Sequence, residues 1–450
     1  MNIADLIARY DRRVPRYTSY PTAPHFSPAT TAAHYAGWLA ALPDETPLSL
    51  YLHVPFCASL CLFCACHTTV VHHPEPLIAY GATLQTEIAN VAGAIGRRLP
   101  VRHIHWGGGT PTALPPDVMH AIMTALRRQF SVLPDAEIAV EVDPRTLLDE
   151  SVQALGQMGV TRASLGVQDF DPRVQEAVHR RQDYTLTADC AERLRTVGVR
   201  SINLDLIYGL PYQTVPGVAK TVQQALQINP DRVAVFGYAH VPWMKKHQSL
   251  LPAEALPDAT QRFAQRAVVE QVLTAAGYAA IGLDHFARPD DALAAAAASA
   301  RLKRNFQGYT TDDAPVLLGL GASSIGSLPQ GYVQNHPSVP AWRDAVRSGA
   351  LPVARGIALT AEDRLRRAVI ETLMCTNAVD LRAVAEQHGA DPATLMDAAP
   401  ALQSLARDGL VQWDGMRVTL TPEGRPFVRA VAAAFDTYLA AGNARHSAAV

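Results

Sequence analysis

The chain has 450 residues, of which 48% are hydrophobic and 18% charged, and a formal net charge of −2 at pH 7. This composition indicates a folded globular protein with room for more than one domain and excludes a largely disordered chain. A charge so close to zero gives no support for a nucleic-acid partner. The first residues lack the apolar core of a signal peptide, and no apolar run is long enough to span a membrane. We therefore expect a cytoplasmic protein.

Short apolar, β-rich runs alternate with longer amphipathic segments from residue 48 to about residue 287. Such βα repetition predicts a parallel sheet, either doubly wound or barrel-like. The predicted strands cover residues 48–56, 101–109, 137–144, 162–170, 201–210 and 232–240, with a possible seventh at 278–286.

Chemically unusual residues stand where these predicted strands end. GGGTP follows the second strand, Glu141 lies near the end of the third, and Asp205 lies near the end of the fifth. In a (β/α) barrel the carboxyl ends of the strands converge on one mouth, which is where such enzymes place their active sites. A doubly wound sheet would gather only the residues near its switch point. The pattern therefore favours a barrel.

The chain divides into three predicted regions. Residues 1–47 form an N-terminal extension or flap, and 48–355 form the barrel domain with its own C-terminal extension. Residues 356–450 hold helical patterns and then a hairpin with an Asp-Gly turn, which is typical of a winged helix. Acidic residues slightly outnumber basic ones from residue 360 onward, so the reading of this region as a DNA-binding sensor is disfavoured. We expect it to cover the barrel mouth. Its predicted helices are 360–376, 380–389 and 394–408.

Four of the six cysteines lie in the segment CASLCLFCAC, with the spacing C-x3-C-x2-C-x-C. Cytosolic thiols stay reduced, so the segment points to metal binding or catalysis rather than disulfides. Structural zinc sites and ferredoxin-type clusters use four protein ligands. Three thiolates, from Cys57, Cys61 and Cys64, would leave one iron of a [4Fe–4S] cluster open, as catalysis requires. A zinc site and a redox thiol pair are the alternatives.

Other residues could serve a ligand beside these cysteines. The glycines of WGGGTP allow close backbone approach, although a tight βα turn would use them equally well. Glu141, Asp205 and Gln168 end apolar strands, where an unpartnered polar group is costly, and an ion pair is the alternative. Arg180 could contact a carboxylate or lie on a solvated helix face. Tyr51 and His53 are two residues apart on the first predicted strand, so we expect both side chains to point into the barrel.

The N-terminal run RYDRRVPRYTSYPT mixes arginines with tyrosines. The run is either the solvated start of a helix or a flap over an anionic aromatic substrate, and the residues alone favour neither reading.

The cysteine spacing after the first strand of a βα barrel resembles that of the radical S-adenosylmethionine (SAM) enzymes. A wider set of motifs is similar to the family of bacterial oxygen-independent coproporphyrinogen III oxidases. The resemblance implies a partial (β/α) barrel and oxidative decarboxylation of two propionates of coproporphyrinogen III to vinyl groups, giving protoporphyrinogen IX in haem biosynthesis. It also implies a 5′-deoxyadenosyl radical made from SAM. The motifs are PRYTSYPTAPHF, LYLHVPFCASLCLFCACHTTV, WGGGTP, EVDPR, SLGVQDF, NLDLIYGLP, YAHVP, DHFARPDD and RNFQGYTT.

The same resemblance implies roles for individual residues. Cys57, Cys61 and Cys64 would ligate the [4Fe–4S] cluster, and two SAM molecules would bind beside it. Cys66 would lie near the reacting groups, to donate a hydrogen or to hold the second SAM. One SAM would contact Tyr51, Gly108, Glu141 and Ile325. The other would contact Phe63, Gly109, Thr110, Gln168, Arg180, Asp205 and Ala239. Tyr51 and Cys66 are the predicted catalytic residues.

The resemblance also suggests partners and a competing activity. A flavodoxin or ferredoxin would supply the electron, and the protein would act as a monomer. A related group of radical SAM-like proteins binds haem as a chaperone, but it generally lacks the cysteine equivalent to Cys66 and the PRYTSYPT segment.

Overall fold

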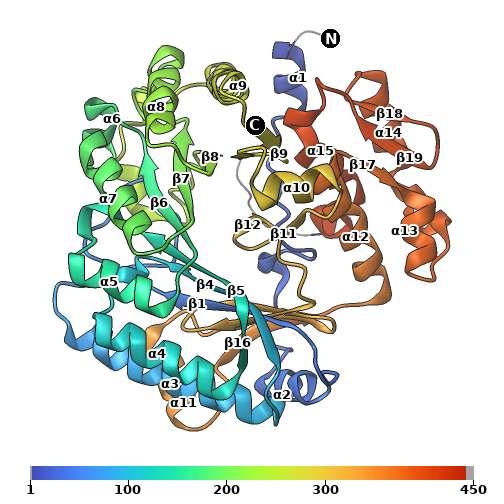
Figure 1. The fold of residues 1–450 in the computed structure, drawn as a ribbon. Helices are drawn as coiled ribbons and strands as arrows, with labels where there is room; N and C mark the ends of the chain where they lie inside the picture. The colour runs from blue at the N-terminus through green and yellow to red at the C-terminus, as the bar shows by residue number, and fades with distance from the viewer. Residues whose placement is uncertain (1–2, 442–450) are drawn as a thin grey trace.

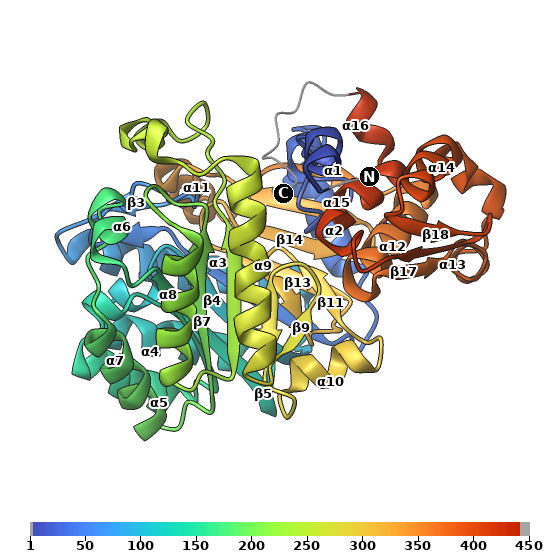
Figure 2. The same ribbon diagram turned by 90° about the horizontal axis from the view of Figure 1, so that it is seen from above.

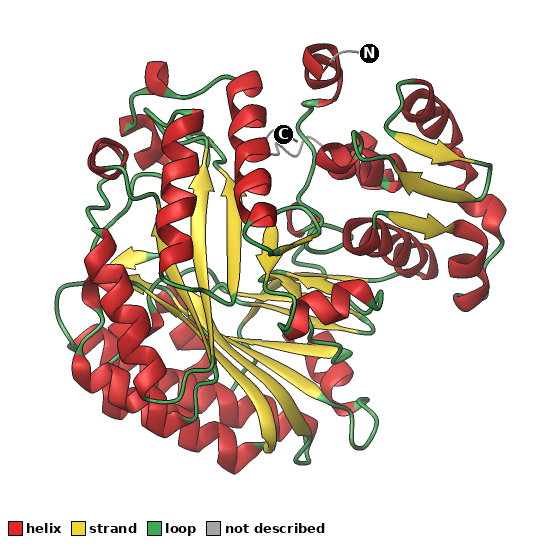
Figure 3. Cartoon of the chain, turned by 45° about the horizontal axis from the view of Figure 1, so that its top comes forward, coloured by secondary structure: helices red, strands yellow, loops and turns green. Residues whose placement is uncertain are grey.

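The computed structural model describes residues 3–441 and is built around one large sheet (Figure 1). Its strand order is β16-β15-β14-β13-β1-β4-β5-β6-β7-β8-β10-β9. The strands from β13 to β8 in this order are parallel. Among the described residues the two end strands do not pair, so the curved sheet is a partial barrel, as predicted (Figure 3). The parallel strands are β1 (Leu48–Val54), β4 (Pro100–Gly108), β5 (Ser131–Val142), β6 (Arg162–Gln168), β7 (Ser201–Tyr208), β8 (Arg232–Gly237) and β13 (Val316–Leu320).

The strands form because their apolar runs are buried between the barrel interior and a layer of helices. Leu50 and Leu52 of β1 are almost fully buried, and Leu52 pairs in register with Trp106 of β4. The amphipathic segments become helices that cover the outer face of the sheet (Figure 2), while the inner face of the parallel strands encloses the barrel interior. The helices are α3 (Glu75–Ile95), α4 (Pro116–Gln129), α5 (Asp149–Met158), α6 (Pro172–Ala177), α7 (Tyr184–Thr196), α8 (Val215–Gln227) and α9 (Ala259–Ala275). Within residues 3–441, no helix has both the length and the apolar character of a membrane span.

The seventh predicted strand, 278–286, is wrong as a parallel barrel strand. This stretch splits into β9 (Ala279–Ile281) and β10 (His285–Ala287), which pair antiparallel with each other. Gly282 adopts a positive φ of 58° between them and reverses the chain, which the alternation of apolar residues did not reveal. Strands β6, β7 and β8 also end two or three residues earlier than predicted, at the start of their loops.

Residues 303–358 extend the sheet at the edge beside β1, although their sequence showed no clear pattern. After β13 the chain runs antiparallel through three strands, and helix α11 (Val339–Arg347) lies between the last two. A small hairpin of β11 and β12 precedes them. These strands are β11 (Lys303–Asn305), β12 (Gly308–Thr310), β14 (Ile325–Leu328), β15 (Gly331–Asn335) and β16 (Val353–Ala358).

Glu87 on α3 fastens this extension to the barrel. The buried carboxylate accepts hydrogen bonds from Gly321 N (2.7 Å), Asn335 Nδ2 (2.6 Å) and Trp342 Nε1 (3.0 Å). Burial raises the pKa of Glu87 to about 7, although the three donors favour its charged form. One acidic group therefore joins α3 to the turn after β13, to β15 and to α11.

The C-terminal part has α-helices within the predicted ranges 360–376 and 380–389, but the range 394–408 divides into a 3₁₀ helix (Pro392–Ala398) and an α-helix (Ala399–Arg407). The predicted hairpin follows, in a three-stranded sheet of order β17-β19-β18. Its hydrophobic core also contains Leu6, Ile7, Tyr10 and Tyr17, so the N-terminal segment packs on this part (Figure 1). The sequence pattern gave no sign of that contact. The boundaries at 47 and 355 stay a prediction. The N-terminal segment contains α1 (Ile3–Tyr10) and α2 (Ala32–Ala40), and α10 (Ala292–Ala298) precedes the hairpin of β11 and β12. The elements of the C-terminal part are α12 (Ala361–Thr376), β17 (Ala378–Asp380), α13 (Leu381–Gln387), α14 (Ala399–Arg407), β18 (Val411–Trp413), β19 (Arg417–Leu420), α15 (Val428–Ala432) and α16 (Thr437–Ala441).

Candidate active site

The cysteine segment forms a loop at the carboxyl end of β1. Two short parallel strands, β2 (Phe56–Cys57) and β3 (Thr69–Val70), pair at its base and close it. Inside the loop Cys64 N donates to Cys61 O (3.1 Å), and Thr110 Oγ1 lies 3.6 Å from Cys57 Sγ. The loop is therefore shaped by its own backbone and by the end of β4.

The segment after β8 holds the cysteine loop from the other side. Lys245 Nζ donates to Cys66 O (2.7 Å), Gln248 Nε2 donates to Phe63 O (2.9 Å), and His247 Nε2 lies 2.7 Å from Cys64 O. These three side chains come from a stretch in which the sequence showed no motif, so sequence reasoning missed them.

Most of the predicted site residues line one cavity of about 180 Å³ at this end of the sheet. A second cavity of about 260 Å³ lies inside the barrel and shares Cys66, Glu141, Ser164 and Asp205 with the first. Cys66 therefore lies where the two spaces meet. The predicted residues on the first cavity are Cys57, Cys61, Phe63, Cys64, Cys66, Gly108, Gly109, Thr110, Glu141, Gln168, Arg180 and Asp205.

Three predicted residues do not line either cavity. Tyr51 lies close by, stacked on His105 with ring centroids 5.8 Å apart. Ala239 is in the loop after β8, and Ile325 starts β14 and packs on a small apolar cluster that contains Tyr332.

The glycines of WGGGTP lie against three different groups of the protein. A Cβ on Gly107 would stand 2.5 Å from Glu141 Oε1, and one on Gly108 would stand 2.6 Å from the ring of His53. On Gly109 it would stand 2.5 Å from the carbonyl oxygen of Phe56. The absence of side chains here lets β4 and the residue after it approach the cysteine loop, the His53 ring and the Glu141 carboxylate. The sequence analysis related these glycines to a ligand or to a tight turn, and not to these contacts within the protein.

Glu141 and Asp205 are half-buried carboxylates whose pKa values shift in opposite directions. Burial opposes the charge on Glu141, but hydrogen bonds from His105 Nε2 (3.2 Å) and Gly108 N (3.1 Å) leave its pKa below the usual value. Burial raises the pKa of Asp205 to about 6 despite hydrogen bonds from Ser164 and Asn203, and the charge of Glu141 adds to the rise. Such divergence between neighbouring carboxylates is typical of functional sites.

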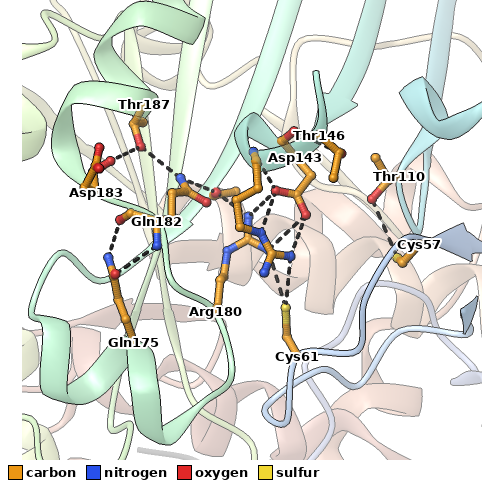
Figure 4. Close-up of polar contacts among 12 residues, drawn as sticks. Cys57, Cys61, Thr110, Asp143, Thr146, Gln175, Arg180, Gln182, Asp183 and Thr187 are labelled. Carbon is orange, nitrogen blue, oxygen red and sulfur yellow. Dashed lines mark hydrogen bonds and ion pairs between the residues drawn. The ribbon is translucent and has the colours of Figure 1, made fainter. Parts of the chain in front are cut away.

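Two arginines, both bound to Asp143, point N–H groups at the thiol of Cys61 (Figure 4). Arg145 Nη2 and Arg180 Nη1 each lie 3.5 Å from Cys61 Sγ, and Arg145 Nη2 also binds Asp143 Oδ2 (2.7 Å). Arg180 is buried and donates to Gly166 O (2.6 Å), so it does not lie on a solvated face. Burial opposes the charge of Asp143, but the two guanidinium groups lower its pKa overall. Sequence reasoning named EVDPR as a motif but gave Arg145 no role.

The thiols differ in acidity because their surroundings differ. Burial raises the pKa of Cys57 to about 11. A hydrogen bond between the thiols of Cys64 and Cys66 lowers the pKa of Cys64 to about 6 and raises that of Cys66. These three thiols are thus not equivalent, and Cys66 acts on Cys64 directly.

The donor set suits an iron–sulfur cluster better than one ion. Among residues 3–441, no three His, Cys, Asp or Glu side chains converge on a point that could hold a single metal ion. A four-iron cluster is larger, so its thiolate ligands stand further apart than those of one ion. Cys57, Cys61 and Cys64 all border the same cavity, and arginine N–H groups point at one of the sulfurs.

The arginines of the N-terminal run have different surroundings. Arg9 pairs with Asp408 (3.0 Å), and Arg13 lies over the exposed Trp243 (4.9 Å). Arg12 is exposed, whereas Arg16 turns inward and donates to Gly237 O (2.8 Å) at the end of β8. The exposed Arg12 fits the reading as a solvated helix end, whereas the flap over an anionic aromatic substrate stays a prediction.

Comparisons with known proteins agree with this geometry. The model of the radical SAM superfamily matches residues 51–225, and that of the HemN C-terminal domain matches 359–427. The oxygen-independent coproporphyrinogen III oxidase of Bradyrhizobium diazoefficiens is 52% identical over 99% of this chain and 100% of the relative. The chain belongs to the oxygen-independent coproporphyrinogen III oxidase family. The member from Paracoccus denitrificans is 44% identical over 98% of this chain and 97% of its own.

A solved structure of the same family has the same fold. The coproporphyrinogen III oxidase (HemN) from Escherichia coli, described as a radical SAM enzyme, matches with a TM-score of 0.90 and 38% identity over 95% of this chain and 100% of its own. The predicted family and fold class are thereby confirmed. Membership of the radical SAM superfamily implies a [4Fe–4S] cluster and SAM, as predicted.

Proposed function

We propose that this chain catalyses the oxygen-independent conversion of coproporphyrinogen III to protoporphyrinogen IX, in which two propionate side chains lose CO2 and become vinyl groups. The observation that carries the proposal is the cavity that brings the cysteine loop, the glycine-rich end of β4 and the carboxylates Glu141 and Asp205 together. The relatives that align over nearly the whole chain are named for this oxidation.

Cys57, Cys61 and Cys64 would hold the cluster. When bound, the cluster and SAM would supply a 5′-deoxyadenosyl radical able to remove a hydrogen atom from the β-carbon of a propionate, and loss of CO2 and of one electron to an external acceptor would then leave the vinyl group. The protein's own part is to position the groups and exclude water. Arg145 and Arg180 each direct an N–H group at Cys61 Sγ, and these contacts would orient that sulfur as a cluster ligand.

The two sides of the cavity offer different groups to two SAM molecules. Gly108 and the ionised Glu141 stand together, suited to an amino group and to ribose hydroxyls. Gln168 ends β6 and Asp205 lies within the neighbouring β7, and both line the cavity together with Arg180. Gln168 has a left-handed φ of 73°, a conformation that costs on the order of 1 kcal/mol in a non-glycine residue and is typical of functional sites. Two adjacent SAM sites account for both groups.

Cys66 would act on the substrate or on the second SAM. Its thiol lies where the two cavities meet and is hydrogen-bonded to that of Cys64. Lys245 fixes its backbone through the carbonyl oxygen. A thiol so placed can donate a hydrogen atom or a hydrogen bond into either space.

The remaining parts of the proposal concern partners. A small electron carrier, flavodoxin or ferredoxin, would reduce the cluster, and the protein would work as a monomer in the cytoplasm. The exposed outer residues of the cysteine loop give such a carrier access.

An anaerobic assay tests the proposed reaction. The chain is reconstituted with iron and sulfide and given SAM, a reductant and coproporphyrinogen III, and CO2 and porphyrin masses are followed. Loss of two carboxyl groups per substrate is the expected result, and Cys57→Ala is the matched inactive control. Tight haem binding without decarboxylation would instead indicate the chaperone-like activity.

A further inference from the structure

The segment between β8 and α9 carries a group of exposed apolar side chains. Trp243, Met244 and Leu250 are 40%, 65% and 69% exposed, and all three fall within eight residues of the sequence. The other exposed large hydrophobic side chains of residues 3–441 lie singly along the chain. Single exposed apolar side chains are ordinary, whereas a group of them marks a surface that contacts another molecule. We call residues 241–250 the β8 lobe.

Hydrogen bonds hold the β8 lobe in one shape, so its apolar side chains stay exposed. The buried Gln248 accepts at Oε1 from Val241 N (2.6 Å) and donates from Nε2 to Phe63 O (2.9 Å). Met244 N and Lys245 N both donate to Val241 O, at 2.9 and 3.0 Å. A surface that is already ordered loses little conformational entropy when a partner binds to it. The lobe is therefore suited to be a rigid contact surface.

The β8 lobe also touches the backbone of the cysteine loop. His247 Nε2 lies 2.7 Å from Cys64 O, and Lys245 Nζ donates to Cys66 O (2.7 Å). Lys246, which stands between these two residues in the sequence, is exposed. One hydrogen bond thus connects the lobe to a cysteine of the predicted ligand set. An electron that enters the protein at this surface has a short path to the cluster.

The β8 lobe is positively charged. Residues 241–253 contain Lys245 and Lys246 but no Asp or Glu. The exposed Arg13 lies over the ring of Trp243, 4.9 Å from its centroid, and brings a third positive charge to the same surface. Groups of this sign attract an acidic protein and raise the rate at which it reaches the surface.

The acidic residues nearest to the lobe in sequence do not cancel this charge. Asp11 is followed by Arg12 and Arg13, and Glu254 is the first acidic residue after the lobe. With the two lysines, four basic residues thus stand against two acidic ones. Exposed acidic and basic residues are equal in number on α6 and at its ends, beside the cysteine loop; they are Asp171, Glu176, Arg173 and Arg181.

We propose that the β8 lobe is the docking surface for a small acidic one-electron carrier that reduces the cluster. The proposal rests on the proposed function, because it takes the cysteines to hold a redox cluster. One electron leaves the reduced carrier and enters the oxidised cluster, and no bond forms or breaks. Trp243 and Met244 would pack against the carrier, since Trp and Met are enriched in protein interfaces, while Arg13 and Lys246 would face its acidic groups.

Carrier binding tests this surface without turnover. The probe is a purified flavodoxin, titrated anaerobically in a calorimeter into the full reconstituted chain without SAM or substrate. The variants are Lys246→Glu and Trp243→Ala. The matched control is Arg128→Glu, which reverses an exposed charge in the last turn of α4, just before β5 begins and thus at the end of the sheet away from the cysteine loop.

The dissociation constant for flavodoxin should rise about fivefold to thirtyfold in each lobe variant and stay unchanged in Arg128→Glu. Added salt should weaken binding to the wild-type protein, because it screens exposed charges. Equal dissociation constants for the wild type, Lys246→Glu and Trp243→Ala would overturn the docking surface.

Reduction of the cluster separates docking from damage to the site. Dithionite needs no docking surface, so it should reduce the cluster of Lys246→Glu as fast as that of the wild type, whereas reduced flavodoxin should act more slowly on the variant. Slower reduction by both would overturn the proposal, because the lobe would then serve the cluster itself. The proposed function stands in either case if the wild type decarboxylates with dithionite, and a wild type that holds no cluster would overturn both.

Discussion

Replacing Gly109 with alanine should disrupt the cysteine loop through a backbone collision. The added Cβ would stand 2.5 Å from Phe56 O, whereas ordinary contact begins at 3.4 Å, so the two backbones must separate by about 0.9 Å. Gly109 N donates to Val54 O (2.8 Å) and Thr110 N to Phe56 O (2.7 Å), so the separation breaks or stretches both bonds. Overpacking of this kind costs about 1–3 kcal/mol. The strain falls on the residue before Cys57.

Two measurements on the same samples check this prediction. Iron and sulfide content after anaerobic reconstitution should fall in Gly109→Ala, and the free energy of unfolding in denaturant should drop by about 1–3 kcal/mol. The control is Gly93→Ala on α3, where nothing lies within 4 Å of the new Cβ. That variant should bind a full cluster and gain about 0.5–1 kcal/mol. A Gly109→Ala protein with full iron content and unchanged stability would refute the reasoning.

Three further predictions concern single side chains. Cys66→Ser should retain the cluster's absorbance but lose decarboxylation, and normal turnover would reduce Cys66 to a packing residue. Arg145→Gln should lower the reduction potential of the cluster, because it removes a positive N–H donor from Cys61 Sγ; a redox titration followed by electron paramagnetic resonance that finds no change would contradict this. Burial raises the pKa of Glu87 from 4.5 to about 7, so the folded protein holds that proton more tightly than the unfolded chain. The resulting stabilisation, about 3 kcal/mol, is complete below pH 4.5 and lost as pH rises towards 7. The difference in unfolding free energy between wild type and Glu87→Gln should show this slope, and a difference that does not vary with pH would exclude it.

The sequence predicted those parts of the site that local pattern determines. Cysteine spacing identified the loop, and polar residues at the ends of apolar strands identified Glu141 and Asp205, because parallel strands bring their carboxyl ends to one edge. Arg145 could have been proposed as a site residue, because it is the last residue of the motif EVDPR. Its contact with Cys61 depends on how the loop folds back and has no signature in spacing.

Features that depend on distant packing could not be predicted. The alternating residues of 278–286 resemble one strand, but Gly282 turns the chain and gives two antiparallel strands. The packing of α1 on the C-terminal part joins the two ends of the chain, and nothing in either end specifies the other. Arg304 donates to the backbone carbonyl of Arg16, which lies 288 residues away in the sequence, and no sequence pattern indicates such a contact.

The most direct test of the central claim follows one hydrogen atom. Coproporphyrinogen III deuterated at the β-carbons of its propionates is turned over anaerobically by the reconstituted chain, and the 5′-deoxyadenosine formed is analysed by mass. Transfer of deuterium into 5′-deoxyadenosine, together with CO2 release and vinyl groups, is the predicted result. Cleavage of SAM without deuterium transfer, while the propionates stay intact, would contradict the assignment of this site to propionate decarboxylation.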